Sequence, residues 1–207
     1  MTDFRTFDSE ALAPQEIYPL LVHAVSPRPI ALTSTLSETG EPNLAPFSFF
    51  MAGGVNPVSV VISVSNTRTG ATKDTLRNIK ATGEYVINIV TFGMKENMNQ
   101  TSVSYLPGES EWEHTSFTPG PCLKVKPKRV LQSPISMECR LFHVIEHGSN
   151  PLSANYVIGE VVCVHVAIEL FSENGKIDPE RVDYIARMGG DWYSRVTPAS
   201  MFEMERP

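Results

Sequence analysis

Apolar and polar residues alternate along several short segments of this chain, which is the pattern of half-buried β-strands. Residues 58–65 have an apolar face and a face richer in serine, the apolar one formed by Val58, Val60, Ile62 and Val64. Residues 32–36 and 43–47 flank a polar turn that contains Gly40, an arrangement typical of a hairpin. Further strands are expected at residues 85–90, 136–146 and 156–171. Many short strands predict a mainly β barrel rather than a doubly wound sheet.

Helical signals are few and short. Residues 14–22 are expected to form a short helix that enters the barrel, and residues 92–103 a second one. Thr72 or Asp74 is expected to cap a helix that runs to about Thr82, where Gly83 ends it.

One more helix is expected near the end of the chain. Asp178, Pro179 and Glu180 combine an acidic cap, a proline at the first helical position and a second carboxylate near the helix dipole. The apolar stripe of this helix and its terminating glycines are expected at Val182, Ile185, Met188, Gly189 and Gly190.

The size and charge of the chain limit its function. Its 207 residues suffice for one sizeable domain, expected at residues 14–196 between an N-terminal arm at 1–13 and a C-terminal tail at 197–207. A net charge of −6 argues against a nucleic-acid partner, whose binding face would be basic. Because no apolar run is long enough for a membrane span, no membrane association is expected.

The cysteines and the first residues indicate the compartment. Cys122, Cys139 and Cys163 form no CxxC pair, and the N-terminal residues lack the apolar core of a secretory signal. These features predict reduced thiols and a cytoplasmic location. Cys139 and Cys163 lie within apolar strand patterns, where a buried structural role is the default.

The histidines do not have the spacing of metal ligands. His143 and His147 share one face of a predicted strand, but four strand residues span roughly 13 Å, too far for one metal ion. The chain also lacks HExxH and any Cys/His ligand spacing, so no metal site is expected.

Lys73, Asp74 and Thr75 stand at the start of a predicted helix. A helix N-terminus offers backbone N–H groups and a partial positive charge, which suit a phosphate, and Lys73 and Thr75 would add a charge and a hydroxyl. An ordinary capped surface helix would have the same spacing, so both interpretations stay open. Arg28, held extended between two prolines, suits either a bound anion or a structural salt bridge.

Three blocks of sequence carry a family resemblance. They are SPRPIALTST at residues 26–35, NLAPFSFF at 43–50 and KDTLRNIKATGEYVINIV at 73–90. Their order and spacing closely resemble the flavin reductase-like family of FMN-binding split β-barrels, over residues 14–196. The resemblance implies a mainly β, antiparallel Greek-key split barrel with a few short peripheral helices. It also implies a homodimer with the flavin site at or near its interface.

The resemblance further implies a flavin site and its chemistry. The cofactor would be FMN rather than FAD, reduced by NADH, NADPH or another donor, and no side chain is expected to act as a catalytic acid or base. A monooxygenase or another redox protein is the expected partner. The residues expected to bind the cofactor are Arg28, Thr33, Ser34, Thr35, Asn43, Ala45, Pro46, Ser48, Ser63, Lys73, Thr75, Gly189 and Tyr193.

One departure from the family pattern keeps rival functions open. Shorter members often carry a Gly-Asp-His element linked to nicotinamide use, whereas residues 153–160 here read SANYVIGE. The C-terminal ARMGGDWYSR resembles the branch that keeps FMN bound. The alternatives are therefore an oxidoreductase, a non-enzymatic FMN-binding electron carrier, or a related barrel for another ligand such as a pyridoxal-type phosphate or haem.

Overall fold

The computed structural model describes residues 2–106 and 108–207, and strands dominate it, with 37% strand and 20% helix. The prediction of a mainly β fold is confirmed. The helices are α1 (Pro14–Ala24), α2 (Asp74–Thr82) and α3 (Lys95–Gln100). The strands are β1 (Arg28–Pro29), β2 (Ala31–Leu36), β3 (Pro42–Phe47), β4 (Phe50–Val55), β5 (Val58–Ser63), β6 (Glu84–Ile89), β7 (Pro119–Gly120), β8 (Arg129–Val130), β9 (Ile135–His147), β10 (Ala154–Val166), β11 (Ile185–Gly189) and β12 (Trp192–Arg195).

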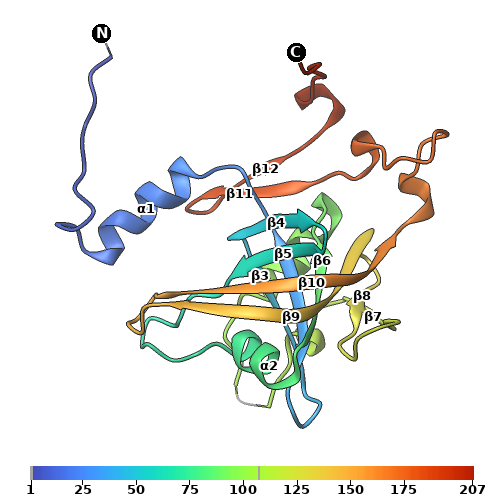
Figure 1. Cartoon of the computed structure of the whole chain (residues 1–207), viewed down its shortest axis with the longest axis horizontal. Coiled ribbons are helices and arrows are strands. Elements are labelled where there is room, and N and C mark those ends of the chain that lie inside the picture. Colours follow the sequence, from blue (N-terminus) through green and yellow to red (C-terminus); the bar gives the residue numbers. More distant parts are fainter. Residues whose placement is uncertain (1, 107) are drawn as a thin grey trace.

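The main sheet has seven antiparallel strands in the order β3-β2-β6-β9-β10-β5-β4. Laid flat, its outermost strands would be separated by about 29 Å. Yet β3 and β4 are joined by Ser48 and Phe49 alone, which allow a separation of at most about 11 Å. The sheet must therefore curl until its two edges meet, and Figure 1 shows this barrel with the long β9–β10 hairpin extending from it.

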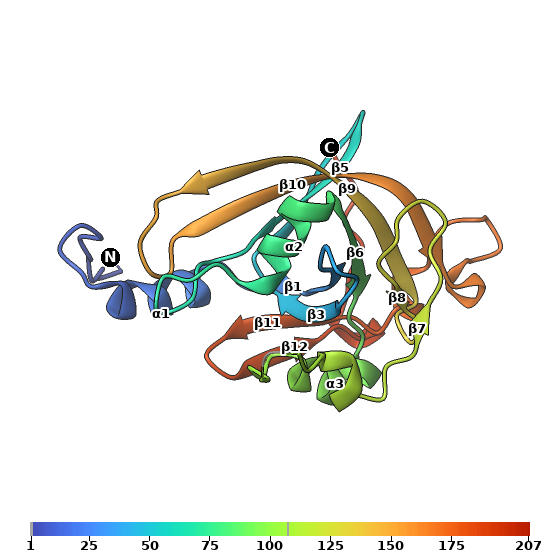
Figure 2. The ribbon, with the colours of Figure 1, turned by 90° about the horizontal axis from the view of Figure 1, so that it is seen from below.

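Two groups of buried side chains form the core. One group joins the barrel strands to α2 through Leu76 and Ile79, both fully buried. The other lies around Leu32 and Leu44 and includes Met94 and Ile185. Figure 2 shows α2 on the concave side of the arch formed by β9 and β10. This packing fixes the first turn of α2 beside strand β3.

Most predicted elements form close to their expected limits, but the cap of α2 differs. The N-cap residue is Lys73, and no side chain caps the helix, so neither Thr72 nor Asp74 has the predicted role. Gly83 ends α2 as predicted, with a left-handed φ of 71° that glycine adopts without strain. The strand expected at 156–171 stops at Val166, before a short 3-10 turn.

The prediction of a helix after Asp178 is wrong. Asp178 does cap Glu180, but only a 3-10 turn, Pro179–Arg181, forms. Asp183 then takes a positive φ of 56°, which breaks any helix, and the chain continues as β11 and β12. Strand β11 pairs with β1, so Gly189 belongs to a strand end rather than to a helix terminus.

The part of the chain before α1 has neither helix nor strand in its described residues, and Figure 1 shows it leading away from the barrel. The boundaries predicted for arm, domain and tail stay predictions. No helix within the described ranges is long and apolar enough to cross a membrane.

Gly159→Ala is expected to destabilise the protein by about 1–3 kcal/mol, because the site is already full. A Cβ atom at Gly159 would lie 1.8 Å from Tyr85 Oη, and the Tyr85 side chain is fully buried. Urea denaturation would measure the loss. Gly93→Ala is the matched control, since a Cβ atom there meets nothing within 4 Å. Equal stability of the two variants would show that Tyr85 moves aside without cost.

Candidate functional site

A cavity of about 790 Å³ opens between strand β3, the start of α2 and the segment that follows α3. Strand β3 contributes Asn43, Ala45 and Pro46, and the start of α2 contributes Lys73 and Thr75. The opposite wall comes from residues 101–106 and 108–111 together with Glu113. The volume suits a nucleotide-sized or drug-sized ligand.

One end of the cavity is suited to an anion. Three features lie together there: Lys73, the hydroxyl of Thr75 and the first turn of α2, whose backbone N–H groups have no acceptors within the helix. Among the described residues, no carboxylate lies within ion-pair distance of Lys73 Nζ. Desolvation by its surroundings lowers the pKa of Lys73 below its ordinary value of 10.5. A bound phosphate would relieve this cost by supplying the opposite charge.

A buried polar network supports this end of the cavity. Asn43 Nδ2 donates to Thr75 Oγ1 at 3.1 Å and to Thr35 Oγ1 at 3.3 Å. Asn78 Nδ2 also donates to Thr35 Oγ1, at 3.1 Å. Because Thr75 Oγ1 accepts from Asn43, its own proton is free to be donated into the cavity. The network thus holds β2, β3 and α2 in one arrangement and orients the Thr75 hydroxyl.

Most of the other charged residues that line the cavity are acidic. Arg77 is paired with Asp74, which leaves Lys73 as the unpaired cation among the described lining residues. Burial raises the pKa of Glu111, although the N–H of Leu44 donates to its carboxylate at 2.9 Å and opposes that shift. The carboxylates that line the cavity are Glu41, Asp74, Glu109, Glu111 and Glu113.

The predicted site residues fall into separate places. Asn43, Ala45, Pro46, Lys73 and Thr75 line the cavity, and Thr35 supports it from below. The side chains of Thr33 and Ser34 are buried in the sheet and do not line it. Ser63 is also buried, and its hydroxyl has no hydrogen-bond partner among the described residues.

A second group of predicted residues gathers at the end of α1. The Arg28 guanidinium is buried and donates to the carbonyls of Val22 and Val25, so it closes the C-terminal end of that helix rather than forming a salt bridge. Ser48 Oγ accepts from Arg28 Nε at 3.4 Å. Gly189 lies against the same helix, because a Cβ atom there would be 2.8 Å from the His23 ring.

Tyr193 lies on β12, where it pairs with Arg187 of β11, and Arg187 pairs on its other side with Arg28 of β1. The Tyr193 hydroxyl contacts Arg187, whose guanidinium carbon lies 4.5 Å from the centre of the Tyr193 ring. Neither it nor Arg28, Ser48 or Gly189 lines the large cavity. Flavin contacts of these residues stay predictions.

The residues expected from the sequence to bind the cofactor do not include the opposite wall of the cavity. Ser110 Oγ donates to the Pro42 carbonyl at 2.6 Å, and the Glu111 carboxylate accepts from the Leu44 N–H. Both bonds fasten this segment to the edge of β3. The one local signal is Ser110, which accepts from the Trp112 N–H as the cap of a 3-10 turn.

The family model of the flavin reductase like domain matches residues 23–179, more than half of the chain. The protein therefore belongs to the flavin reductase-like family. An uncharacterised protein of Halalkalibacterium halodurans is 36% identical over 201 residues, covering 96% of this chain and 94% of its own length.

Solved structures agree with this assignment. Nitrilotriacetate monooxygenase component B from Bacillus cereus has a TM-score of 0.92 and 30% identity, and the match covers 99% of this chain and all of that one. The 2-nitrobenzoate 2-nitroreductase of Pseudomonas fluorescens has a TM-score of 0.87 and 29% identity, with 98% and 96% covered. A Shewanella frigidimarina protein described as a flavin reductase with a split barrel domain has a TM-score of 0.81 and 26% identity, with 98% and 100% covered. Together with the family, these relatives support flavin-related redox chemistry.

Proposed function

We propose that this protein binds FMN in the cavity beside α2 and acts as a flavin-dependent oxidoreductase. The observation that carries the proposal is the meeting of Lys73, the Thr75 hydroxyl and the uncapped start of α2 at one end of that cavity. This donor set fits a phosphate monoester. Strand β3 would lie along the ring, with Ala45 and Pro46 as apolar contacts and Asn43 as a polar one.

The cations that line the cavity favour FMN over FAD. A second phosphate would need a second cation, but the other cation in the described lining, Arg77, is already paired with Asp74.

The protein's part in the reaction is to bind and position the cofactor. When bound, FMN supplies the chemistry by accepting electrons from NADH, NADPH or another donor and passing them on. Lys73 and Thr75 would hold the phosphate, and the Asn43 network would keep both in place. A monooxygenase or another redox protein is the acceptor that we propose.

We also propose a homodimer with the flavin site at or near its interface. Large apolar side chains are exposed on structured elements, which favours a protein partner there. Phe142 on β9 is 67% exposed and Met51 on β4 is 58% exposed, and Tyr18 and Leu21 of α1 are also exposed. Sedimentation would contradict this proposal by finding a monomer in the presence of FMN.

The electron-carrier alternative rests on residues 153–160, which lack the histidine linked to nicotinamide use. In the structure this stretch includes the start of β10 and has Tyr156 facing His147, with Tyr156 Oη 3.4 Å from His147 Nδ1. Stopped-flow mixing of the flavin-loaded protein with NADH or NADPH separates the two functions. Fast bleaching of the flavin band supports the enzyme, and an unchanged band supports the carrier.

The proposed function is tested first by absorbance and titration. Purified protein is expected to show a flavin spectrum, or to gain one when FMN is added and free ligand is removed. FAD added in the same way is expected to bind more weakly. Absence of a flavin band under both conditions would overturn the proposal.

The affinity for FMN is expected to depend on pH at both ends of the range. Below about pH 6 the phosphate monoester loses its second charge, so binding weakens. At high pH binding weakens as Lys73 loses its proton, and because desolvation lowers the pKa of this residue, the decline begins before pH 10.5 is reached. FMN fluorescence titrations across pH would measure this, and Lys73→Met is expected to keep the acidic limb and lose the alkaline one.

A further inference from the structure

A second cluster of reactive side chains lies where the long strands β9 and β10 pair. An irregularity in the register between Val161 and Cys163 places Cys163, rather than Val162, opposite Glu138. His165 then stands two residues further along β10, on the same face as Cys163. The strand pairing therefore brings the carboxylate of Glu138 to a thiol and an imidazole that lie 25 and 27 residues later in the chain.

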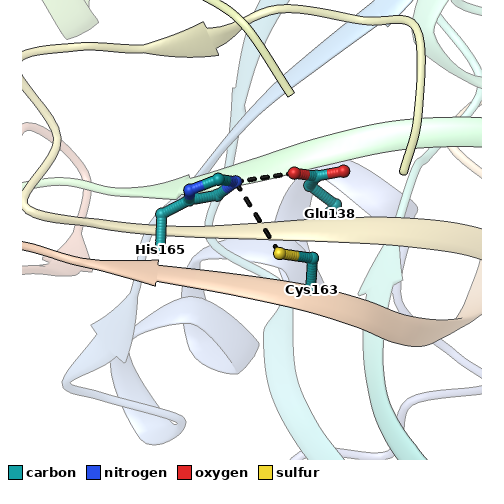
Figure 3. A group of neighbouring side chains, drawn as sticks. All are labelled: Glu138, Cys163 and His165. Carbon is teal, nitrogen blue, oxygen red and sulfur yellow. Dashed lines mark hydrogen bonds and ion pairs between the residues drawn. The ribbon is translucent and has the colours of Figure 1, made fainter. Parts of the chain in front are cut away.

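The three side chains point toward one another (Figure 3). His165 Nε2 lies 2.6 Å from Glu138 Oε1 and 3.9 Å from Cys163 Sγ. One ligand atom from each residue falls within 4.8 Å of the other two. Among the described residues, Glu138, Cys163 and His165 are the group of three potential metal ligands whose ligand atoms lie this close together.

We propose that Glu138, Cys163 and His165 form a binding site for one divalent transition metal of the zinc class. Zinc holds thiolate sulfur at about 2.3 Å and histidine nitrogen or carboxylate oxygen at about 2.0–2.2 Å. Two ligands of one tetrahedral zinc ion are therefore about 3–4 Å apart. The sulfur–nitrogen distance already fits, and the oxygen–nitrogen pair needs to open by about 0.7 Å.

Burial and hydrogen bonding prepare the carboxylate for this role. The Glu138 side chain is fully buried and accepts from the N–H groups of Leu123, Lys124 and Val125. A carboxylate has about four acceptor directions, so the metal would take the one now directed at His165. His165 is 20% exposed and Cys163 is partly exposed, which leaves solvent access for a water ligand.

The thiol makes metal binding depend on pH. Burial and the charge of Glu138 raise the pKa of Cys163, so the metal must displace a thiol proton. His165 must also carry its remaining proton on Nδ1 when Nε2 binds the metal. Metal affinity is therefore expected to rise with pH.

This site is separate from the flavin cavity, since none of its three residues lines that cavity. The bound ion would cross-link β9 and β10, and the hydrogen bonds of Glu138 would connect this link to the segment at Leu123–Val125. The metal-binding test below therefore does not depend on whether the protein binds FMN.

The test is titration of the reduced, full-length protein with Co²⁺ at neutral pH, followed by competition with Zn²⁺. The expected result is one Co²⁺ per chain with a thiolate-to-cobalt charge-transfer band in the near ultraviolet, removed by Zn²⁺. Cys163→Ser is expected to abolish the band, and His165→Gln to weaken binding at least tenfold. At the same Zn²⁺ concentration, the metal is expected to raise the melting temperature of the wild-type protein more than that of either variant.

Two control variants identify rival sites. Cys122 also lies near Glu138, whose charge adds to burial in raising the pKa of Cys122 to about 11, so Cys122→Ser must keep the band. His147→Gln, which changes an exposed histidine, must keep it as well. The proposal is overturned if no thiolate band forms, if the band survives in Cys163→Ser, or if it disappears in Cys122→Ser instead.

Discussion

Replacing Lys73 with methionine is expected to weaken FMN binding by about 10- to 100-fold. The ammonium is the unpaired positive charge of the described cavity lining, and it stands beside the start of α2. A charge-assisted hydrogen bond contributes about 1.5–3 kcal/mol, which corresponds to this range of affinity. Methionine keeps the length and apolar stem of the side chain, so the loss measures the charge. Titration of FMN fluorescence with the purified variant gives the dissociation constant.

The fold is expected to tolerate this change. No carboxylate among the described residues pairs with Lys73, and removing its desolvated charge leaves no partner without a counter-ion. Lys80→Met is the matched control, because Lys80 lies on the same helix but pairs with Glu146 at the surface. Equal FMN affinity of the two variants would place the phosphate elsewhere and contradict the proposed site.

The sequence predicted correctly those strands and helices whose structure depends on residues close together in the chain. From Ser59 to Ile62, strand β5 alternates between partly exposed and buried residues because its side chains point to opposite faces of the sheet. Helix α2 has an apolar stripe at Leu76 and Ile79 and a glycine in the left-handed region after it. The same local signals placed Lys73 and Thr75 at a helix start, and the structure brings them to a cavity with residues of β3.

Local signals failed where a distant segment decides the structure. The helix start at Asp178 and Pro179 exists, but only as a 3-10 turn. Beyond it, β11 pairs with Arg28 and Pro29, which lie more than 150 residues earlier in the chain. Hydrogen bonds of that kind leave no mark in a short window of sequence. Ile185 is buried in β11, and it would also have been buried on the apolar stripe of a helix. Its apolar character therefore could not distinguish a strand from a helix.

Distant pairing also explains why the Glu138 cluster could not be predicted. Ligand spacing in the sequence is informative when ligands share a helix or a loop. Here the residues come from two strands, and the register irregularity at Val162 determines which side chain faces Glu138. Similarly, the cavity wall at Ser110 and Glu111 depends on bonds to β3 and not on its own composition.

Glu138→Ala is expected to lower the free energy of unfolding by about 3–5 kcal/mol, a large part of the 5–15 kcal/mol typical of a domain. The carboxylate is fully buried and accepts from three consecutive backbone N–H groups, at 2.8 Å from Leu123, 2.6 Å from Lys124 and 3.1 Å from Val125. Alanine would leave these donors without an acceptor, at about 1–3 kcal/mol each where water cannot reach them. Urea denaturation followed by circular dichroism measures the change.

The acid limb of the stability curve gives an independent check on Glu138. Burial alone would raise its pKa, but the hydrogen bonds from Leu123, His165 and Lys124 prevail and hold the pKa of Glu138 below the ordinary value of 4.5. A carboxyl group with a depressed folded-state pKa contributes stability above its unfolded pKa and loses it as the pH falls through the folded one. The wild-type protein should therefore lose stability below about pH 4.5 more steeply than Glu138→Ala. Glu146→Ala, on the same strand but exposed and paired with Lys80, should destabilise the protein far less and keep most of the wild-type acid limb, because solvent screens an exposed ion pair. If the two variants were equally stable, the segment at Leu123–Val125 would have to find other acceptors, and Glu138 would not be its anchor.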